Sequence, residues 1–439
     1  MTELNPHQIV EALNQHVVGQ ASAKKAVAIA LANRSRRQKT PHSIRKEISP
    51  KNILMMGPTG VGKTEIARRI SALTHAPFIK VEATKFTEVG YVGRDVESIV
   101  RDLIDIAYKM QRDKAIAATR HEAKIAAEKI IIETLYPIKK NSKGKKSDHK
   151  PEDRDTYFKQ LREGKLDSKP IEINITNSLG IEIMAPAGME EMSYQIEGLL
   201  QNLSTDKGKT KKMTVKEARK ALEDEEAEKL LNEDKIKLQA ITNTEQNGIV
   251  FLDEIDKVIR HSSSQGEVSR EGVQRDLLPL LEGTTVVTKY GSISTDHILF
   301  IASGAFMGVT PSDMISELQG RLPIRVEMLP LNQKDFELIL TEPTASLIDQ
   351  YQALLATEKV SLNFTPKGIA RIAEISFHCN KTSDNIGARR LHTVLEKLLA
   401  DISFNAHQHA HQTIKIDDTY VNDQLKTIIQ SDDLSKWIL

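Results

Sequence analysis

The stretch GPTGVGKT at residues 57–64 decides the fold of this chain. It matches the phosphate-loop pattern GxxxxGK[ST], whose glycines let backbone N–H groups turn inward around phosphates. An apolar run at residues 52–56 precedes it, and residues 65–73 after it have the apolar spacing of a helix. Strand, loop and helix thus follow in the order that phosphate binding needs. Lys63 is predicted to reach the β and γ phosphates, and the Thr64 hydroxyl to ligate Mg²⁺.

A pair of acidic residues, Asp253 and Glu254, follows the buried-type apolar run 249–252. The carboxyl end of a strand in a parallel sheet points at the ligand crevice. We therefore predict that Asp253 holds magnesium through water and that Glu254 polarises an attacking water, which makes hydrolysis the expected outcome. The alternative is that these carboxylates only favour the positive end of a helix. Their combination with the phosphate loop favours the catalytic interpretation.

Several short apolar runs separated by helical segments are typical of a parallel sheet covered on both faces. We therefore predict an α/β fold with a P-loop core. The four runs lie at residues 52–56, 78–81, 249–252 and 298–302.

The interval between the second and third runs is too long for one crossover connection. Asp95 is a plausible N-cap of a helix whose apolar pattern continues toward Tyr136, a length of roughly 60 Å. A strand is expected at residues 171–175 and a helix at 215–231, while the lysine-rich stretch 139–150 is expected to be a solvated loop and not a binding arm. We predict a mainly helical inserted domain over residues 110–244.

The remaining residues divide around this insertion. Residues 1–109 and 245–330 are predicted to form the nucleotide-binding domain, and residues 331–439 a small, mainly helical domain. In the latter, Thr365 and Pro366 look like the N-cap and first residue of a helix. The histidines of HQHAHQ at residues 407–412 are expected in a polar loop, because no cysteine or ordered carboxylates accompany them.

Composition limits the functions open to the chain. Its 439 residues include 61 Lys and Arg against 60 Asp and Glu, so net charge +1 provides no global basic field for nucleic acid. The single Cys379 excludes an internal disulfide and fits a reducing compartment. No basic and apolar leader begins the sequence, and no apolar run approaches the ~18 residues of a membrane span. We expect a cytoplasmic protein without a membrane partner.

Three further residues have roles that spacing alone leaves open. Tyr91 lies between Gly90 and Gly93 in EVGYVGRD, and glycines on both sides favour a ring that is presented and not packed. Arg321 in ELQGR and Arg389 in GARR are each compatible with an ordinary surface arginine.

These motifs, in this order, resemble the AAA+ ATPases. Within them, the nearest resemblance is to the HslU (ClpY) family of unfoldase subunits, which partner HslV peptidases. The resemblance covers nearly the whole chain. It rests on VVGQ at 17–20, the phosphate loop, GYVGRD, the insertion, VFLDEID, SREGVQRDLLPLLEG, FIASGAF, ELQGRLPIR, NIGARRLHTVLE and the terminal LSKWIL.

The resemblance implies a site for ATP with Mg²⁺ at the subunit interfaces of a homohexamer. Val18 would line the adenine pocket, and Arg321 would be an arginine finger given to a neighbouring subunit. Glu254, Lys63 and Arg321 would then be the catalytic residues, and Arg389 a second sensor arginine. Ser303 stands where many members place a polar sensor, often asparagine. The full set of nucleotide-binding residues would be Val18, Gly60, Val61, Gly62, Lys63, Thr64, Glu65, Asp253, Glu317 and Arg389.

The resemblance also implies a substrate and a partner. The pore loop Gly90, Tyr91, Val92 and Gly93 would grip unfolded or tagged protein substrates. The apolar tail would dock into an HslV-type peptidase double ring, although a terminal helix packed on its own domain is the simpler interpretation of the same pattern. The tail residues are Leu434, Trp437, Ile438 and Leu439.

Three alternatives stay open. A ClpX-type unfoldase shares GYVG, but that family has a four-cysteine zinc domain that this chain lacks. A nucleic-acid motor would need a basic face and a helix-turn-helix or winged region. An inactive scaffold is disfavoured because Lys63, Thr64, Asp253 and Glu254 are all present.

Overall fold

The structure is a computed structural model that describes residues 5–45, 47–87, 94–136, 151–175, 209–259 and 270–426. Its chain divides into two compact units. The main unit consists of the residues up to Ala107 together with those from Ile241 onward, and the inserted unit spans Tyr108–Ala240. The division into three domains expected from sequence, with a separate domain at residues 331–439, stays a prediction.

The main unit is built on a parallel sheet of five strands in the order β2-β5-β8-β1-β9. The middle strands are buried along nearly their whole length, as uninterrupted apolar runs covered on both faces should be. The four predicted strands are confirmed. The strands are β1 (Ile53–Met56), β2 (Phe78–Glu82), β5 (Ile249–Asp253), β8 (Leu299–Gly304) and β9 (Ile324–Glu327).

Helices of the N-terminal region and the phosphate-loop helix share one apolar core with this sheet, including Leu13, Val27, Ile66 and Phe251. A second sheet of two antiparallel strands, β6 (Thr285–Thr288) and β7 (Gly291–Ser294), lies apart from the parallel one. The helices are α1 (Pro6–Asn14), α2 (Ala21–Gln38), α3 (His42–Arg45), α4 (Lys63–Thr74), α10 (Arg270–Glu282) and α11 (Ser316–Arg321), with short 3-10 turns η1 (Ala83–Lys85), η2 (Ile255–Val258) and η3 (Pro311–Asp313).

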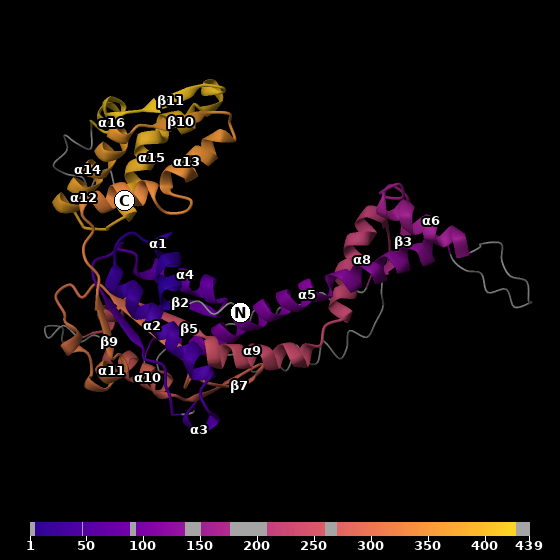
Figure 1. The fold of residues 1–439 in the computed structure, drawn as a ribbon, viewed down its shortest axis with the longest axis horizontal. Coiled ribbons are helices and arrows are strands. Elements are labelled where there is room, and N and C mark those ends of the chain that lie inside the picture. The colour runs from indigo at the N-terminus through magenta and orange to yellow at the C-terminus, as the bar shows by residue number, and fades with distance from the viewer. Residues whose placement is uncertain are drawn as a thin grey trace, which may run out of the picture. The chain divides into compact units, whose positions relative to one another are not determined.

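The C-terminal part of the main unit has its own apolar core, formed mainly by α12, α14 and α15 (Figure 1). Thr365 accepts a hydrogen bond from the Gly368 amide and Pro366 begins α14, so the predicted helix start is confirmed. Its elements are α12 (Gln333–Thr341), α13 (Leu347–Ala356), β10 (Ser361–Phe364), α14 (Pro366–Thr382), α15 (Arg389–Phe404), η4 (Ala406–His409), β11 (Thr413–Ile416) and α16 (Asp418–Gln424).

The inserted unit packs α5, α6, α8 and the antiparallel pair β3 and β4 around one core. The buried Glu128 carboxylate accepts from both Arg162 and Arg219 at 2.9 and 3.0 Å. The expected strand and helix at its centre are confirmed. The elements are α5 (Ser98–Leu135), α6 (Pro151–Arg162), β3 (Pro170–Ile175), β4 (Lys209–Thr214), α8 (Val215–Lys229) and α9 (Glu233–Asn247), of which α5 begins and α9 ends in the main unit.

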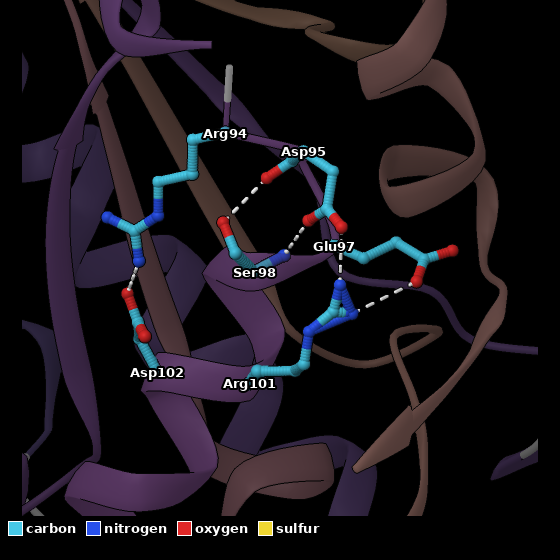
Figure 2. A network of polar contacts seen from close by, with 6 residues as sticks. All are labelled: Arg94, Asp95, Glu97, Ser98, Arg101 and Asp102. Atoms are coloured by element: carbon cyan, nitrogen blue, oxygen red, sulfur yellow. Dashed lines mark hydrogen bonds and ion pairs between the residues drawn. The ribbon is translucent and has the colours of Figure 1, made fainter. Parts of the chain in front are cut away.

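The start of α5 is fixed by a polar network (Figure 2). The Asp95 carboxylate accepts from the Ser98 amide at 2.7 Å and from Arg101 at 2.5 Å, which confirms Asp95 as the cap of this end. Arg94 pairs with Asp102, which lies one helical turn after Ser98. The helix runs for 38 residues, as the continuous apolar pattern predicts. Among the described residues no helix has both the length and the apolar character needed to cross a membrane.

Candidate functional site

The phosphate loop connects β1 to α4 and has an unusual backbone. Gly60 and Gly62 have φ of +75° and +105°, which side chains other than glycine rarely adopt. Gly62 is the left-handed N-cap of α4 and has no side chain to satisfy the first helical amides. The first turn of α4 therefore presents unsatisfied N–H groups and a partial positive charge toward the loop.

Lys63 lies at the first position of α4 with its ammonium turned back into the loop. Its Nζ donates to the carbonyl oxygens of Gly57 and Pro58 at 2.5 and 2.8 Å. Burial lowers the pKa of Lys63, an effect that Asp253 and Asp256 partly offset. Among the described residues no carboxylate forms an ion pair with it, so a buried cation is available for an anion.

Asp253, at the end of β5, contacts side chains from the neighbouring strands β2 and β8. Its Oδ1 accepts from the Ser303 hydroxyl at 2.6 Å, and its Oδ2 lies 2.8 Å from Lys80 Nζ and 3.4 Å from Thr64 Oγ1. Burial alone would raise the pKa of Asp253, but the hydrogen bonds from Lys80 and Ser303 outweigh it and lower the pKa. The carboxylate is therefore ionised beside the Thr64 hydroxyl, as a magnesium ligand must be.

Glu254 follows with a left-handed backbone, φ +58°, at the start of η2. The side chain is exposed, and within the described part of the chain its carboxylate has no ion pair. A free carboxylate next to a magnesium-binding aspartate can accept a proton from water.

A cavity of about 630 Å³ joins these residues in the main unit. A volume of this size is typical of a small-molecule site. From the predicted set the cavity is lined by Val18, Gly60, Val61, Gly62, Lys63, Thr64, Glu65, Asp253, Glu254 and Arg389.

The N-terminal end of α15 touches the phosphate loop directly and so places Arg389 at the cavity. The Ala388 amide donates to the Gly60 carbonyl at 3.0 Å. Gly387 has φ +60°, and a Cβ there would lie 2.4 Å from the Thr59 carbonyl oxygen, so glycine is needed for this close approach.

Two predicted residues lie elsewhere in this single chain. Glu317 and Arg321 belong to α11 and do not line the cavity. The Arg321 guanidinium instead pairs with Glu282 at 2.9 Å. Ser303 is not a lining residue either, but it reaches the site through Asp253. The pore-loop residues Gly90 to Gly93 and the tail residues Leu434, Trp437, Ile438 and Leu439 lie outside the described residues.

Sequence reasoning missed Lys80, the cationic partner of Asp253. A lysine between the buried Ile79 and Val81 of the strand FIKVE was the available signal, because a charge in the middle of a strand usually has a partner. It also missed His16, which lines the cavity beside Val17 and whose buried Nδ1 has no hydrogen-bond partner among the described residues.

Three family models match the chain. The model described as "ATPase family associated with various cellular activities (AAA)" matches residues 53–197, starting at the first residue of β1. "AAA domain (Cdc48 subfamily)" matches residues 176–337, which include Asp253, Glu254 and Arg321. The chain has the AAA+ P-loop fold and is similar to AAA+ ATPase domains. The third match, "MCM P-loop domain" over residues 3–102, agrees with this assignment because that domain shares the AAA+ fold.

An AAA+ domain binds nucleotide, usually with Mg²⁺, and supports hydrolysis of ATP. The residues of the cavity fit these groups. The loop amides and the unpaired Lys63 ammonium suit the phosphates, and the ionised Asp253 with the Thr64 hydroxyl suits the metal. Bound magnesium would withdraw charge from the terminal phosphate during its transfer to water.

Proposed function

We propose that this chain is an ATP-dependent protein unfoldase of the HslU type. It would assemble as a homohexamer, thread protein substrates through the central pore, and deliver them to an HslV-type peptidase that it also activates. The chain itself would be an ATPase and regulatory subunit, with no peptidase activity. The resemblance of its motifs in order, from VVGQ to the apolar tail, supports this proposal.

The observation that supports the proposal concerns the described residues on either side of the predicted pore loop, whose own residues lie outside the described part of the chain. Phe86 forms a parallel β-bridge with Arg94, and the Thr87 amide donates to the Arg94 carbonyl at 3.4 Å. The bridge joins two described residues that flank this stretch of sequence, after β2 and η1. β2, the strand before Phe86, pairs with β5, which ends at Asp253.

In this proposal the chain's own residues divide the work. Lys63 and the loop amides hold the phosphates, Asp253 and Thr64 hold the magnesium, and Glu254 accepts the proton of the attacking water. Arg389, joined to the loop through Ala388 and Gly60, would report the nucleotide to the C-terminal part. The ring of Tyr91 would press on any polypeptide, because such contact needs no particular sequence.

The test mixes the purified chain, ATP and an HslV-type peptidase, and follows the loss of a folded protein substrate. We expect ATP-dependent loss, and we expect Tyr91→Ala to abolish it while ATP turnover stays substantial. Tyr420→Ala is the matched control, since Tyr420 lies in α16 at the C-terminal core. Undiminished degradation by the Tyr91→Ala variant would refute the gripping role.

A truncated chain ending at Asp433 tests the partner. We expect it to hydrolyse ATP and to leave the peptidase inactive, and full activation would exclude the tail as the docking element. If the intact chain itself does not activate an HslV-type peptidase, a ClpX-type unfoldase for another peptidase becomes the better proposal. The match to the MCM P-loop domain keeps a nucleic-acid motor as the more distant one, and DNA-stimulated ATP turnover would favour it.

A further inference from the structure

The chain makes a strained turn directly after β8, at the edge of the nucleotide cavity. Phe306 has φ +54°, a left-handed conformation that is an outlier for a bulky side chain. Its neighbours Gly304, Ala305 and Met307 line the cavity. Such strain persists only where surrounding contacts hold it, and it concentrates at functional sites.

Asp256 supplies the contact that holds this turn. This side chain is only 4% exposed and belongs to η2, three residues after Asp253. Its Oδ2 accepts a hydrogen bond from the Phe306 amide at 3.1 Å. A buried carboxylate needs such a donor, and a hydrogen bond to an ionised acceptor is stronger than a neutral one.

Gly304 packs closely against both Asp256 and Phe306. A Cβ at this position would lie 2.7 Å from Asp256 Oδ1 and 2.8 Å from Cε2 of the Phe306 ring. Asp256, Gly304 and Phe306 therefore pack against one another so closely that no side chain fits between them. We call these three residues the turn lock.

The turn lock is joined to the catalytic residues by one strand. Ser303 precedes Gly304 in β8 and donates to Asp253 at 2.6 Å. Asp253 thus holds Ser303 near the end of β8, and Asp256 holds Phe306 in the turn that follows. Both carboxylates also act on the Lys63 ammonium, whose lowered pKa they partly restore.

We propose that Asp256 is a positioning residue for ATP hydrolysis, which holds the Phe306 turn and thereby keeps Ser303 on Asp253 and the Gly304–Met307 wall against the phosphates. The proposal rests on the ATPase activity of the AAA+ domain and not on the unfoldase proposal. It differs from a direct ligand role, because the hydrogen bond to the Phe306 amide and not the negative charge is what acts.

The test compares variants that separate the hydrogen bond, the charge and the strain. Asp256→Ala removes the acceptor, and we expect kcat to fall by about tenfold to a hundredfold, since small misplacements of catalytic groups cost that much. Asp256→Asn keeps an oxygen acceptor for the Phe306 amide and should retain most of the activity. The double variant Asp256→Ala with Phe306→Gly should recover much of the loss, because glycine adopts φ +54° without strain.

The readouts are kcat, KM and the dissociation constant of a fluorescent, slowly hydrolysed ATP analogue. We expect the analogue's affinity to change much less than kcat does. Asp313→Ala is the matched control, because Asp313 also accepts a backbone N–H, from Thr310 at 2.6 Å, but does not line the cavity. It should leave kcat near the wild-type value.

Three results would overturn the proposal. Asp256→Asn as impaired as Asp256→Ala would show that the charge acts, and an equal loss of analogue affinity would indicate a direct ligand. Unchanged kcat in Asp256→Ala would show that the turn does not matter. If Asp256→Ala does not fold, Phe306→Pro removes the same N–H donor and also excludes φ +54°, because proline fixes φ near −65°. Normal kcat in that variant would show that the turn is not needed and would count equally against the proposal.

Discussion

Burial of the Lys63 side chain is unfavourable: among the described residues its ammonium donates to two loop carbonyls, and burial lowers its pKa. We expect Lys63→Met to weaken binding of ATP by about 10- to 150-fold, since hydrogen bonds to charged groups contribute roughly 1.5–3 kcal/mol. The nucleotide-free variant should melt at the same temperature or higher, because methionine avoids the desolvation of a buried charge. Fluorescent-nucleotide titration and thermal melting measure the two effects. Unchanged affinity would remove Lys63 from the phosphate site.

A change at Glu254 should affect ATP hydrolysis without affecting ATP binding. Glu254→Gln keeps the shape and removes the base, so we expect the rate of phosphate release to fall by about 10²–10⁴ while ATP affinity changes little. Glu358→Gln, an exposed glutamate outside the cavity, is the control. Phosphate release near the wild-type rate in Glu254→Gln would mean that another group accepts the proton.

The polar network at the start of α5 includes Arg94, the first described residue after the predicted pore loop (Figure 2). Asp95→Ala should weaken this end by about 1 kcal/mol, because it removes the cap of the Ser98 amide. Amide exchange in the first two turns of α5 should then be about fivefold faster. Glu97→Ala is the control, because it removes only an exposed ion pair with Arg101. Exposed pairs of this spacing typically contribute less than about 0.5 kcal/mol. Equal exchange rates in the two variants would contradict a capping role.

Elements with a strong local signal were predictable from sequence. The phosphate loop, the buried strands β1, β5 and β8 and the Thr365 cap of α14 were all found, because glycine spacing, apolar runs and caps are written in neighbouring residues. The strand β9 was missed. Only its pairing with β1 makes Ile324–Glu327 a strand, since two of its four side chains are charged and Arg325 is exposed.

Contacts between distant elements were the part of the site that sequence could not provide. The ion pair of Lys80 with Asp253 joins residues 173 positions apart, and the Phe306 amide meets Asp256 across 50. Neither pairing leaves a spacing pattern in the chain. The turn lock therefore became visible only when β5 and β8 were seen side by side.

At the scale of the whole molecule, stability should depend on pH through the partly buried His297. Burial, with Arg37 nearby, lowers the pKa of His297 below its ordinary value of 6.5. The unfolded chain then binds the proton more readily than the folded chain does. The contribution of His297 to the free energy of unfolding is therefore fully present above about pH 6.5 and is lost as the pH falls from there toward the lowered pKa of the folded state. Melting temperatures at pH 8 and 5.5 should differ less in His297→Gln than in the wild type. An identical pH dependence in both would show that His297 contributes nothing to it.

The assembly itself can be tested through Arg321, which does not line the cavity of its own chain and pairs there with Glu282. If the proposed ring forms, Arg321 serves the site of a neighbour, and Arg321→Ala and Glu254→Gln chains are each inactive alone. In a ring formed from equal amounts of both, roughly a quarter of the sites combine an intact Glu254 with an intact neighbouring Arg321, because closed rings repeat one interface. We therefore expect mixing to restore about that share of ATP turnover. Mixed rings of confirmed size without any recovered turnover would place the action of Arg321 within its own chain and would remove the strongest chemical reason for a ring.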